Sequence, residues 1–457
     1  MHQYKTNRIC IIITLLLMCC IPSIGIKTSE AVFKYDMVRD FKEGYACVMS
    51  QGKCGYIDTS GSTIIPFKYD YAWDFNNGLA RVTASSNGTR ITFLKDSHGT
   101  DSEKTHDFYT DYIPVVNDCK FGFIDKQGNE VIPIEYDYAS DFRDSISIVS
   151  KNGKSGVINV KGELLVPLVY ESIYYSECSE KNLLLCACIK GKYGAINYKT
   201  GQIVIPFCYD NQIVFSEGRA VVSMNGKYGY IDKSGNMVIG KEWDIASTFS
   251  GGTAIVQKAG EPFCLIDKNG IIMARIEGSR LIDSYSDGKT LVLYVDSKSR
   301  NRWIMIDSTG KVLNSFNYRT VKPIGNDMYL VSKIHGIKKT QRYGCIDNDG
   351  NNVIPIKFDG IGPMAEKKIP VRKGDKWGYW SNYKKSINFS YQEADCFKDG
   401  IARVIKNGKC GFIDFNENQI LLFIYETVRN FSEGYAAVKN NGKWGFVDMN
   451  GKELDCN

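Results

Sequence analysis

The chain has 457 residues, of which 43% are hydrophobic and 24% are charged, a composition typical of folded globular proteins that excludes a largely disordered chain. The formal net charge is +6 at pH 7, and +4 without residues 1–25, which carry two basic and no acidic side chains. A balance this small and this evenly spread argues against a protein that binds nucleic acid or an anionic membrane through its overall charge.

Residues 1–25 have the pattern of a secretory signal peptide. A short basic region is followed by an apolar run over residues 9–21, which is too short to span a bilayer comfortably. Ser23 and Gly25 then supply the small side chains of a cleavage site. We therefore predict cleavage after Gly25 and a mature chain that is secreted, periplasmic or held at the cell surface.

Two alternatives to a cleaved signal peptide remain. Processing as a lipoprotein at Cys19 or Cys20 would leave an acylated chain tethered to a membrane. A buried first strand or helix would instead need protein to cover the apolar run on every side. No other segment approaches the roughly 18 consecutive apolar residues of a transmembrane helix, so we expect no further contact with a membrane.

One phrase recurs along the rest of the chain. It runs from a basic residue through an aromatic or small residue, Gly and two apolar residues to a closing Asp or Asn, as in Lys53–Asp58. The closing residues are mostly 33 to 40 positions apart, but 67 positions separate Asp58 from Asp125. This gap, about twice the period, predicts an additional degenerate unit with a polar insertion. The predicted array covers residues 32–457, and its twelve units close near Asp58, Lys95 (degenerate), Asp125, Asn159, Asn197, Asp232, Asp267, Asp307, Asp347, Ser381, Asp414 and Asp448.

Each unit contains three short runs that lack the 3.6-residue period of a helix. A lead-in such as Phe41–Val48 precedes the core phrase, and a tail such as Ile64–Asp70 follows it. Asn-Gly pairs, as in Asn225-Gly226, join lead-in to core and suit the positive φ angles of a tight hairpin. A D-x-x-G turn joins core to tail. The pattern predicts a three-stranded antiparallel meander of about 34 residues.

A unit this small cannot bury its apolar face alone, so neighbouring units must stack to form the core. We predict an all-β tandem array of about twelve meanders in an elongated, curved, solenoid-like structure. The alternative is closure into a β-propeller. Twelve units exceed the four to eight blades of typical propellers, and their blades usually have four strands.

The core phrase resembles a known repeat. Lys376-Trp377-Gly378-Tyr379 and Lys443–Asp448 are similar to the WG, or KWG, repeat of bacterial proteins, and the resemblance covers residues 32–457. Trp is present in only three copies, at Trp303, Trp377 and Trp444, and the stretch from about 260 to 335 is eroded. The resemblance implies a β-repeat array in exported or surface proteins that acts as an interaction module, and it implies no catalytic residues.

The repeated polar and aromatic residues have structural explanations. We expect the closing Asp to cap its turn rather than bind calcium, because each unit offers one carboxylate where a calcium loop needs several oxygens. The Lys of the phrase is expected at a solvated strand end, with a continuous basic stripe as the alternative. Most aromatic side chains should fill the contacts between units. The off-pattern Trp73, Trp243 and Trp380 are candidates for an exposed, glycan-stacking position.

Signatures of catalysis, of phosphate loops and of metal sites are missing from the sequence, and only four His residues are present. We therefore predict no catalytic, cofactor-binding or metal-binding residue. Twelve of the 15 Cys lie outside the leader. Most should be buried free thiols, and Cys186 and Cys188 are the candidates for a disulfide.

These observations predict a non-catalytic, exported scaffold of the bacterial envelope that binds a protein or a glycan. The alternative is a hydrolase of envelope polymers with carboxylates donated from loops. A pair of acids about 5 to 9 Å apart would serve such a hydrolase and cannot be recognised in a sequence.

Overall fold

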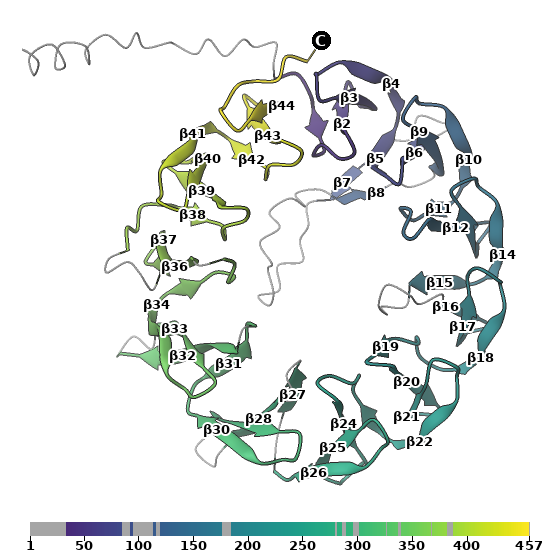
Figure 1. Ribbon diagram of the computed structural model, residues 1–457, viewed down its shortest axis with the longest axis vertical. Coiled ribbons are helices and arrows are strands. Elements are labelled where there is room, and N and C mark those ends of the chain that lie inside the picture. Colours follow the sequence, from purple (N-terminus) through teal and green to yellow (C-terminus); the bar gives the residue numbers. More distant parts are fainter. Residues whose placement is uncertain are drawn as a thin grey trace, which may run out of the picture.

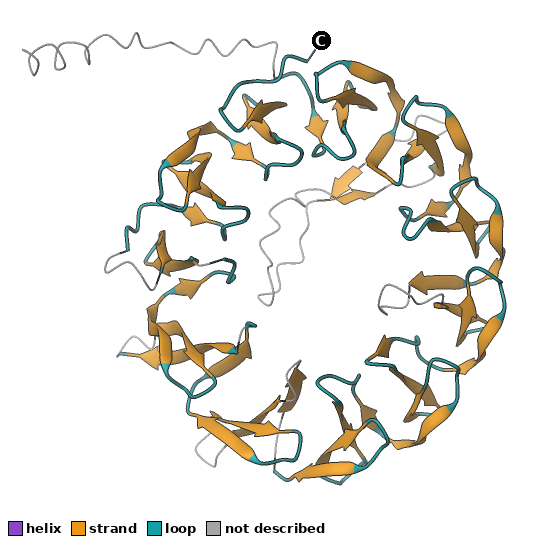
Figure 2. Cartoon of the chain, viewed as in Figure 1, coloured by secondary structure: helices purple, strands orange, loops and turns teal. Residues whose placement is uncertain are grey.

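The computed structural model describes residues 33–84, 92–94, 113–115, 119–175, 184–278, 281–285, 289–295, 301–325, 327–336, 340–366, 368–381 and 387–456. These residues form small antiparallel sheets that stand side by side around a ring (Figure 1). Strands and connecting loops make up the ring, as Figure 2 shows. The predicted signal peptide, its cleavage site and the alternative lipid anchor at Cys19 or Cys20 lie outside the described residues.

Eleven of the sheets are the blades of a β-propeller, which we number in chain order. Blades 1 to 4 consist of β1 (Met37–Val38), β2 (Tyr45–Ser50), β3 (Lys53–Asp58) and β4 (Thr63–Tyr69); β5 (Tyr71–Asn76), β6 (Leu79–Ala84), β9 (Lys120–Asp125) and β10 (Glu130–Tyr136); β11 (Tyr138–Ala139), β12 (Ile146–Lys151), β13 (Lys154–Asn159) and β14 (Leu164–Tyr170); and β15 (Ser172–Tyr175), β16 (Leu184–Ile189), β17 (Lys192–Asn197) and β18 (Ile203–Tyr209).

Blades 5 to 8 consist of β19 (Phe215–Ser216), β20 (Arg219–Met224), β21 (Lys227–Ile231) and β22 (Met237–Trp243); β23 (Ile245–Ala246), β24 (Thr253–Gln257), β25 (Phe263–Asp267) and β26 (Ile272–Ile276); β27 (Leu281–Tyr285), β28 (Lys289–Val295), β29 (Asn301–Asp307) and β30 (Val312–Phe316); and β31 (Thr320–Pro323), β32 (Met328–His335), β33 (Thr340–Asp347) and β34 (Asn352–Phe358). Blades 9 to 11 consist of β35 (Gly360–Ile361), β36 (Ile369–Lys373) and β37 (Lys376–Trp380); β38 (Glu393–Ala394), β39 (Ile401–Lys406), β40 (Lys409–Asp414) and β41 (Gln419–Tyr425); and β42 (Thr427–Val428), β43 (Tyr435–Asn440) and β44 (Lys443–Asp448).

In the four-stranded blades, the lead-in, core phrase and tail are the second, third and fourth strands, as predicted. The first strand was missed in the sequence because it is very short, as in β1 and β11, and follows the tail without a turn signal. In Figure 1 these first strands lie on the inside of the ring and the fourth strands, such as β14 and β18, lie on the outside.

The predicted elongated array is wrong, and the alternative of a closed propeller is correct. The two ends of the described chain meet, because Tyr35 exchanges backbone hydrogen bonds of 3.2 and 2.9 Å with Trp444. Glu453 pairs with Val447 farther along the same strand. The outer edge of blade 11 is therefore assembled from both ends of the chain, which closes the ring and leaves no exposed end of an array.

The predicted twelfth unit, closing near Lys95, is also wrong. Lys95 itself lies outside the described residues, but β6 pairs directly with β9 on both sides of the gap. The long segment between them is an insertion in blade 2 that carries its own two-stranded sheet, β7 (Thr92–Leu94) and β8 (Ile113–Val115). This small sheet lies on the inner side of the ring (Figure 1).

The hydrophobic core lies at the joints between blades. In blade 1, Tyr56 of the core phrase packs against Phe75 of the next lead-in, with ring centroids 4.9 Å apart, and both side chains are buried. The same contact recurs at other joints, between Phe123 and Phe142 at 4.7 Å and between Phe446 and Phe41 at 4.8 Å across the ring closure. Aromatic residues at fixed repeat positions therefore fill the spaces between units, as predicted.

Candidate functional site

The repeated Asp that closes the core phrase is a turn cap, as predicted. Asp232 accepts hydrogen bonds on Oδ1 from the backbone N–H groups of Ser234 and Asn236, each at 2.9 Å. The side-chain hydrogen bond from Asn236, followed by these backbone bonds, lowers the pKa of Asp232. Equivalent bonds form at the closing Asp of other blades, including Asp58, Asp125, Asp267, Asp347 and Asp448.

The repeated Lys has a defined partner that the sequence analysis missed. Lys227 Nζ lies 2.7 Å from Oδ1 of Asp244, the residue between the tail and the first strand of blade 6. The other oxygen of Asp244 accepts a hydrogen bond of 2.8 Å from the N–H of Ala259, in a hairpin turn of blade 6. This Asp thus ties two blades together, and the tail motif Y-D was its signal in the sequence. The same ion pair joins Lys53 to Asp70, Lys120 to Asp137, Lys192 to Asp210 and Lys443 to Asp36.

The Glu of the lead-in forms a second tie between blades. Glu217 accepts hydrogen bonds from the N–H groups of Gly251 and Gly252 in the next blade, at 2.7 and 2.9 Å. Glu433 of blade 11 accepts the same kind of bond from Gly44 of blade 1, at 2.8 Å. The E-G pair of the lead-in therefore helps to close the ring. Repeated polar residues serve the fold, so a functional site must depend on residues that differ between blades.

One arc of the inner rim differs most clearly in charge. Successive blades from 11 to 3 are joined by ion pairs in which an Arg of one blade meets an Asp of the next. Arg39 binds Asp74 through two hydrogen bonds of 2.5 and 3.1 Å. Arg429 lies 3.8 Å from Asp40, and Arg81 lies 3.2 Å from Asp141. We call this chain of three pairs the inner-rim network.

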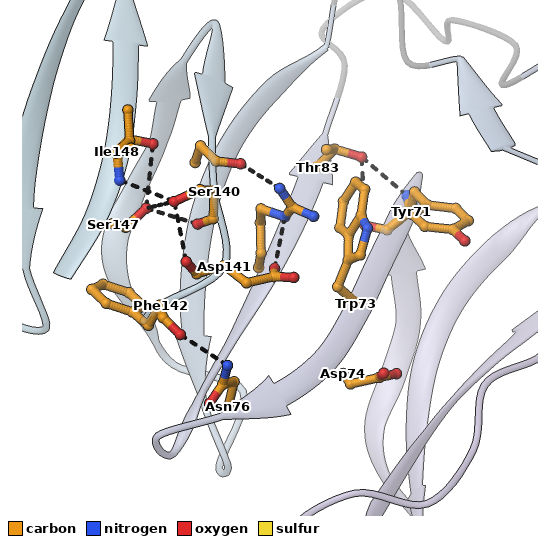
Figure 3. A network of polar contacts seen from close by, with 12 residues as sticks. Tyr71, Trp73, Asp74, Asn76, Thr83, Ser140, Asp141, Phe142, Ser147 and Ile148 are labelled. Carbon is orange, nitrogen blue, oxygen red and sulfur yellow. Dashed lines mark hydrogen bonds and ion pairs between the residues drawn. The ribbon is translucent and has the colours of Figure 1, made fainter. Parts of the chain in front are cut away.

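Arg81 is the most enclosed part of the network. Its guanidinium also donates a hydrogen bond to the carbonyl of Ala139 and lies 4.0 Å from the ring centre of Trp73. Figure 3 shows Trp73, Asp74 and Asp141 on neighbouring blades, with Asn76 donating to the carbonyl oxygen of Phe142 at 2.8 Å. Burial lowers the pKa of Arg81, and the charge of Asp141 opposes that shift. The arginine therefore fixes two blades and one aromatic ring relative to each other.

Asp40 is an acid with an unusual environment. Its Oδ1 is buried and accepts no hydrogen bond. Burial raises the pKa of Asp40, and the charge of Asp74 adds to the shift, whereas Arg429, Arg39 and Lys398 oppose it. Asp40 and Asp74 are therefore two neighbouring carboxyl groups whose surroundings differ, since Asp74 is held by a bidentate arginine.

Tyrosine side chains are exposed on the inner strands of blades 3 and 4. Tyr138 on β11 is 49% exposed and Tyr174 on β15 is 39% exposed, and neither was singled out from the sequence. Of the three tryptophans predicted to be exposed, Trp73 is half-buried under Arg81 and Trp380 is half-buried. Trp243 is only 4% exposed, so that prediction is wrong. Trp243 pairs with Tyr228 just as Tyr69 pairs with Cys54, so it occupies an interior repeat position.

The eleven cysteines among the described residues are free thiols, and nine of them are buried. This includes Cys186 and Cys188, the predicted candidates for a disulfide; Cys186 Sγ accepts a hydrogen bond of 3.3 Å from the N–H of Ile213. Within the described part of the chain, no group of three or more His, Cys, Asp and Glu side chains is arranged to hold a metal ion. Over the same residues, no helix has the length and apolarity needed to cross a membrane.

Comparison with known proteins identifies one repeat family. The family described as WG containing repeat matches the chain at residues 33–54, 55–83, 121–154, 156–192, 193–228, 228–261, 343–377, 384–410 and 411–444. No curated protein is significantly similar to the sequence.

Solved structures also match the chain, at low identity and low TM-score. A eukaryotic initiation factor is 10% identical, covers 73% of this chain and 92% of its own, and has a TM-score of 0.38. BamB from Moraxella catarrhalis is 11% identical, covers 59% and 93%, and has a TM-score of 0.29. Hsv2 from Kluyveromyces lactis is 9% identical, covers 66% and 93%, and has a TM-score of 0.29. These values carry no argument about function.

Proposed function

Because the chain belongs to the WG containing repeat family, we propose that it is a non-catalytic scaffold of the bacterial envelope. Its ring binds a protein or a glycan at the inner rim of blades 2 to 4. The observation that carries the proposal is that repeated and non-repeated side chains have different roles. The repeated Lys, Asp and Glu tie blade to blade, whereas Trp73, Tyr138 and Tyr174 depart from the repeat and are partly exposed.

The chemistry of this rim favours recognition over reaction. Tyrosine and tryptophan offer large rigid contact surfaces with a polar edge, and they recur in protein interfaces and on surfaces that stack against sugars. Arg81 holds Trp73 in place through its contact with the ring and its ion pair to Asp141. A preformed aromatic surface of this kind loses little conformational entropy when a partner binds.

Export follows from the leader rather than from the ring. The apolar run over residues 9–21 and the small residues before position 26 support a secreted, periplasmic or surface location. A lipid anchor at Cys19 or Cys20 is the alternative form of the same proposal.

The test uses the chain from residue 26 to 457, immobilised and cross-linked in an envelope extract of its native organism. We compare it with the double variant Tyr138→Ala/Tyr174→Ala. The matched control is Leu164→Ala/Ile203→Ala, which removes two side chains that are 52% and 59% exposed on outer strands. We expect a partner that the wild-type chain and the control recover and the tyrosine variant loses. Equal recovery by all three chains, or no recovery above background, would refute the proposed site.

A hydrolase of envelope polymers is the second candidate function, and Asp40 is the observation that favours it. A carboxyl that has one buried oxygen and a raised pKa, with a second carboxyl nearby, is the arrangement of a general acid. If the wild-type chain generates new reducing ends from purified envelope polymers and Asp40→Asn does not, the scaffold proposal fails and the hydrolase replaces it. Both chains should be inactive if the protein only binds.

A further inference from the structure

A second surface lies where the outer strand of one blade meets the second strand of the next blade, and the charges of its side chains differ from joint to joint. The positions concerned are the penultimate residue of one outer strand and the end of the second strand in the next blade. Two joints place an acid opposite a base there, since Glu135 lies 2.8 Å from Lys151 and Glu242 lies 2.6 Å from Lys258. These two pairs show that side chains at the two positions can meet across a joint.

The joint between blades 8 and 9 has two bases at the same positions. Lys357 is the penultimate residue of β34, and Lys373 is the last residue of β36. Lys373 is also the cross-strand neighbour of Lys376. All three side chains are exposed, and like charges at facing positions destabilise a sheet.

The acids of this joint do not compensate the three lysines. Asp359 is already bound to Arg342 and accepts a hydrogen bond of 2.8 Å from the N–H of Gly374. At the next joint, Gln392 stands where Asp244 stands after blade 5, so Lys376 has no Asp equivalent to the partner of Lys227. The Gln392 side chain accepts a hydrogen bond of 2.9 Å from the N–H of Gly408. Asp375, in the hairpin turn, is the remaining carboxylate among these residues.

The excess of positive charge continues into blade 10. Lys406, the last residue of β39, is exposed and is the cross-strand neighbour of Lys409. The exposed bases therefore follow one another along two consecutive joints. We call Lys357, Lys373, Lys376 and Lys406 the lysine arc.

We propose that the lysine arc binds a linear anionic glycan, whose regularly spaced acidic groups sit between lysines that the fold leaves facing each other. The proposal adds a second site to the proposed binding function and names its ligand class. Lysine is suited to the task because its compact ammonium group meets phosphate or carboxylate as a point charge. An acidic group between Lys357 and Lys373 would remove the repulsion that these residues have in the free protein.

The decisive variant is Lys357→Glu, which recreates the Glu–Lys pair of the joints between blades 2 and 3 and between blades 5 and 6. It should raise the urea midpoint of the protein, because a like-charge pair becomes an ion pair. It should also weaken glycan binding by about tenfold or more, because one contact is lost and a repulsion is added. The matched control is Lys68→Glu, which changes the net charge equally at the same strand position; in the next blade, Ala84 holds the register position that Lys373 holds in blade 9.

Binding is measured by titration with polygalacturonate and, separately, with poly(ribosylribitol phosphate), a linear glycan with phosphodiester links, at two salt concentrations. We expect at least one polymer to bind, with affinity that falls as salt rises. Lys357→Glu should lose this binding and Lys68→Glu should keep it. The two polymers show whether carboxylate or phosphodiester groups are preferred.

Three results would overturn the proposal: neither polymer binds at low salt, the two variants weaken binding equally, or single-stranded DNA and polyglutamate bind as tightly as the glycans. Failure here is separable from failure of the inner-rim site. The Tyr138→Ala/Tyr174→Ala variant should bind the anionic glycan normally, and Lys357→Glu should recover the inner-rim partner normally.

Discussion

Replacing Gly229 by alanine should destabilise the protein, whereas the same change at Gly240, in the adjacent strand, should not. A Cβ on Gly229 would lie 2.6 Å from the carbonyl oxygen of Ile239 and 3.0 Å from two backbone atoms of Gly240. A Cβ on Gly240 would meet nothing within 4 Å. The cause is the register shift between β21 and β22, which presses the outer strand onto the glycine of the core phrase.

The magnitude follows from these contacts. The strands must separate by about 0.4 Å before the closest contact even reaches 3.0 Å, and overpacking of this kind costs about 1–3 kcal/mol. Alanine at Gly240 should instead stabilise by about 0.5–1 kcal/mol, because glycine in a strand loses more backbone entropy on folding. The two variants should therefore differ by about 1.5–4 kcal/mol. Urea unfolding measures the difference, and equal midpoints, or a lower midpoint for Gly240→Ala, would refute the reasoning.

Three further predictions concern the ring closure, the acids and the thiols. Tyr35→Ala should lower the free energy of unfolding by about 3–5 kcal/mol and enlarge the radius of gyration in solution scattering, because Tyr35 is buried where the start of the described chain pairs with Trp444. An unchanged radius of gyration and an unchanged urea midpoint would contradict closure of the ring by the chain ends. Hydrogen bonds from the Lys of the preceding blade lower the pKa values of Asp210 and Asp244. Their contribution to stability is therefore present above about pH 4 and is lost as the pH falls through the lower folded-state pKa values. The urea midpoint should decrease when the pH is lowered below about 4, and it should decrease less steeply in Asp244→Asn. A urea midpoint that rises on acidification would contradict this prediction. Burial raises the pKa of Cys345 to about 12, so thiol reagents should react slowly with this thiol in the folded chain. After denaturation, the reagent should modify at least eleven thiols per chain; a smaller number would reveal disulfides.

The local structure of each unit was readable from the sequence. Lead-in, core and tail became strands, and Asn225 and Gly226 have the positive φ angles of 53° and 75° that their turn requires. The closing Asp became a turn cap because its role depends only on residues two to four positions away. These features are set by near neighbours in the chain, so a short pattern is enough to predict them.

The sequence also held a sign of closure that the analysis missed. Phe33-Lys34-Tyr35-Asp36 repeats the letters of Phe67-Lys68-Tyr69-Asp70, the end of a tail, although residues 1–32 contain no core phrase. After the last core phrase, Glu453 begins a tail that lacks this ending. The described chain therefore starts with the second half of a tail and ends with the first half, and joining the halves closes the ring.

By itself, the sequence determined the strands, the turns and the all-β repeat, because these depend on residues within one unit. Only the tertiary structure decided that eleven blades form a ring, that an Arg of one blade meets an Asp of the next, and that Glu135 of one blade pairs with Lys151 of the next. These features depend on the angle between neighbouring blades. That angle is set by how side chains such as Tyr56 and Phe75 pack at each joint. The repeat length of about 34 residues does not determine the angle between blades, so the sequence pattern could not predict it.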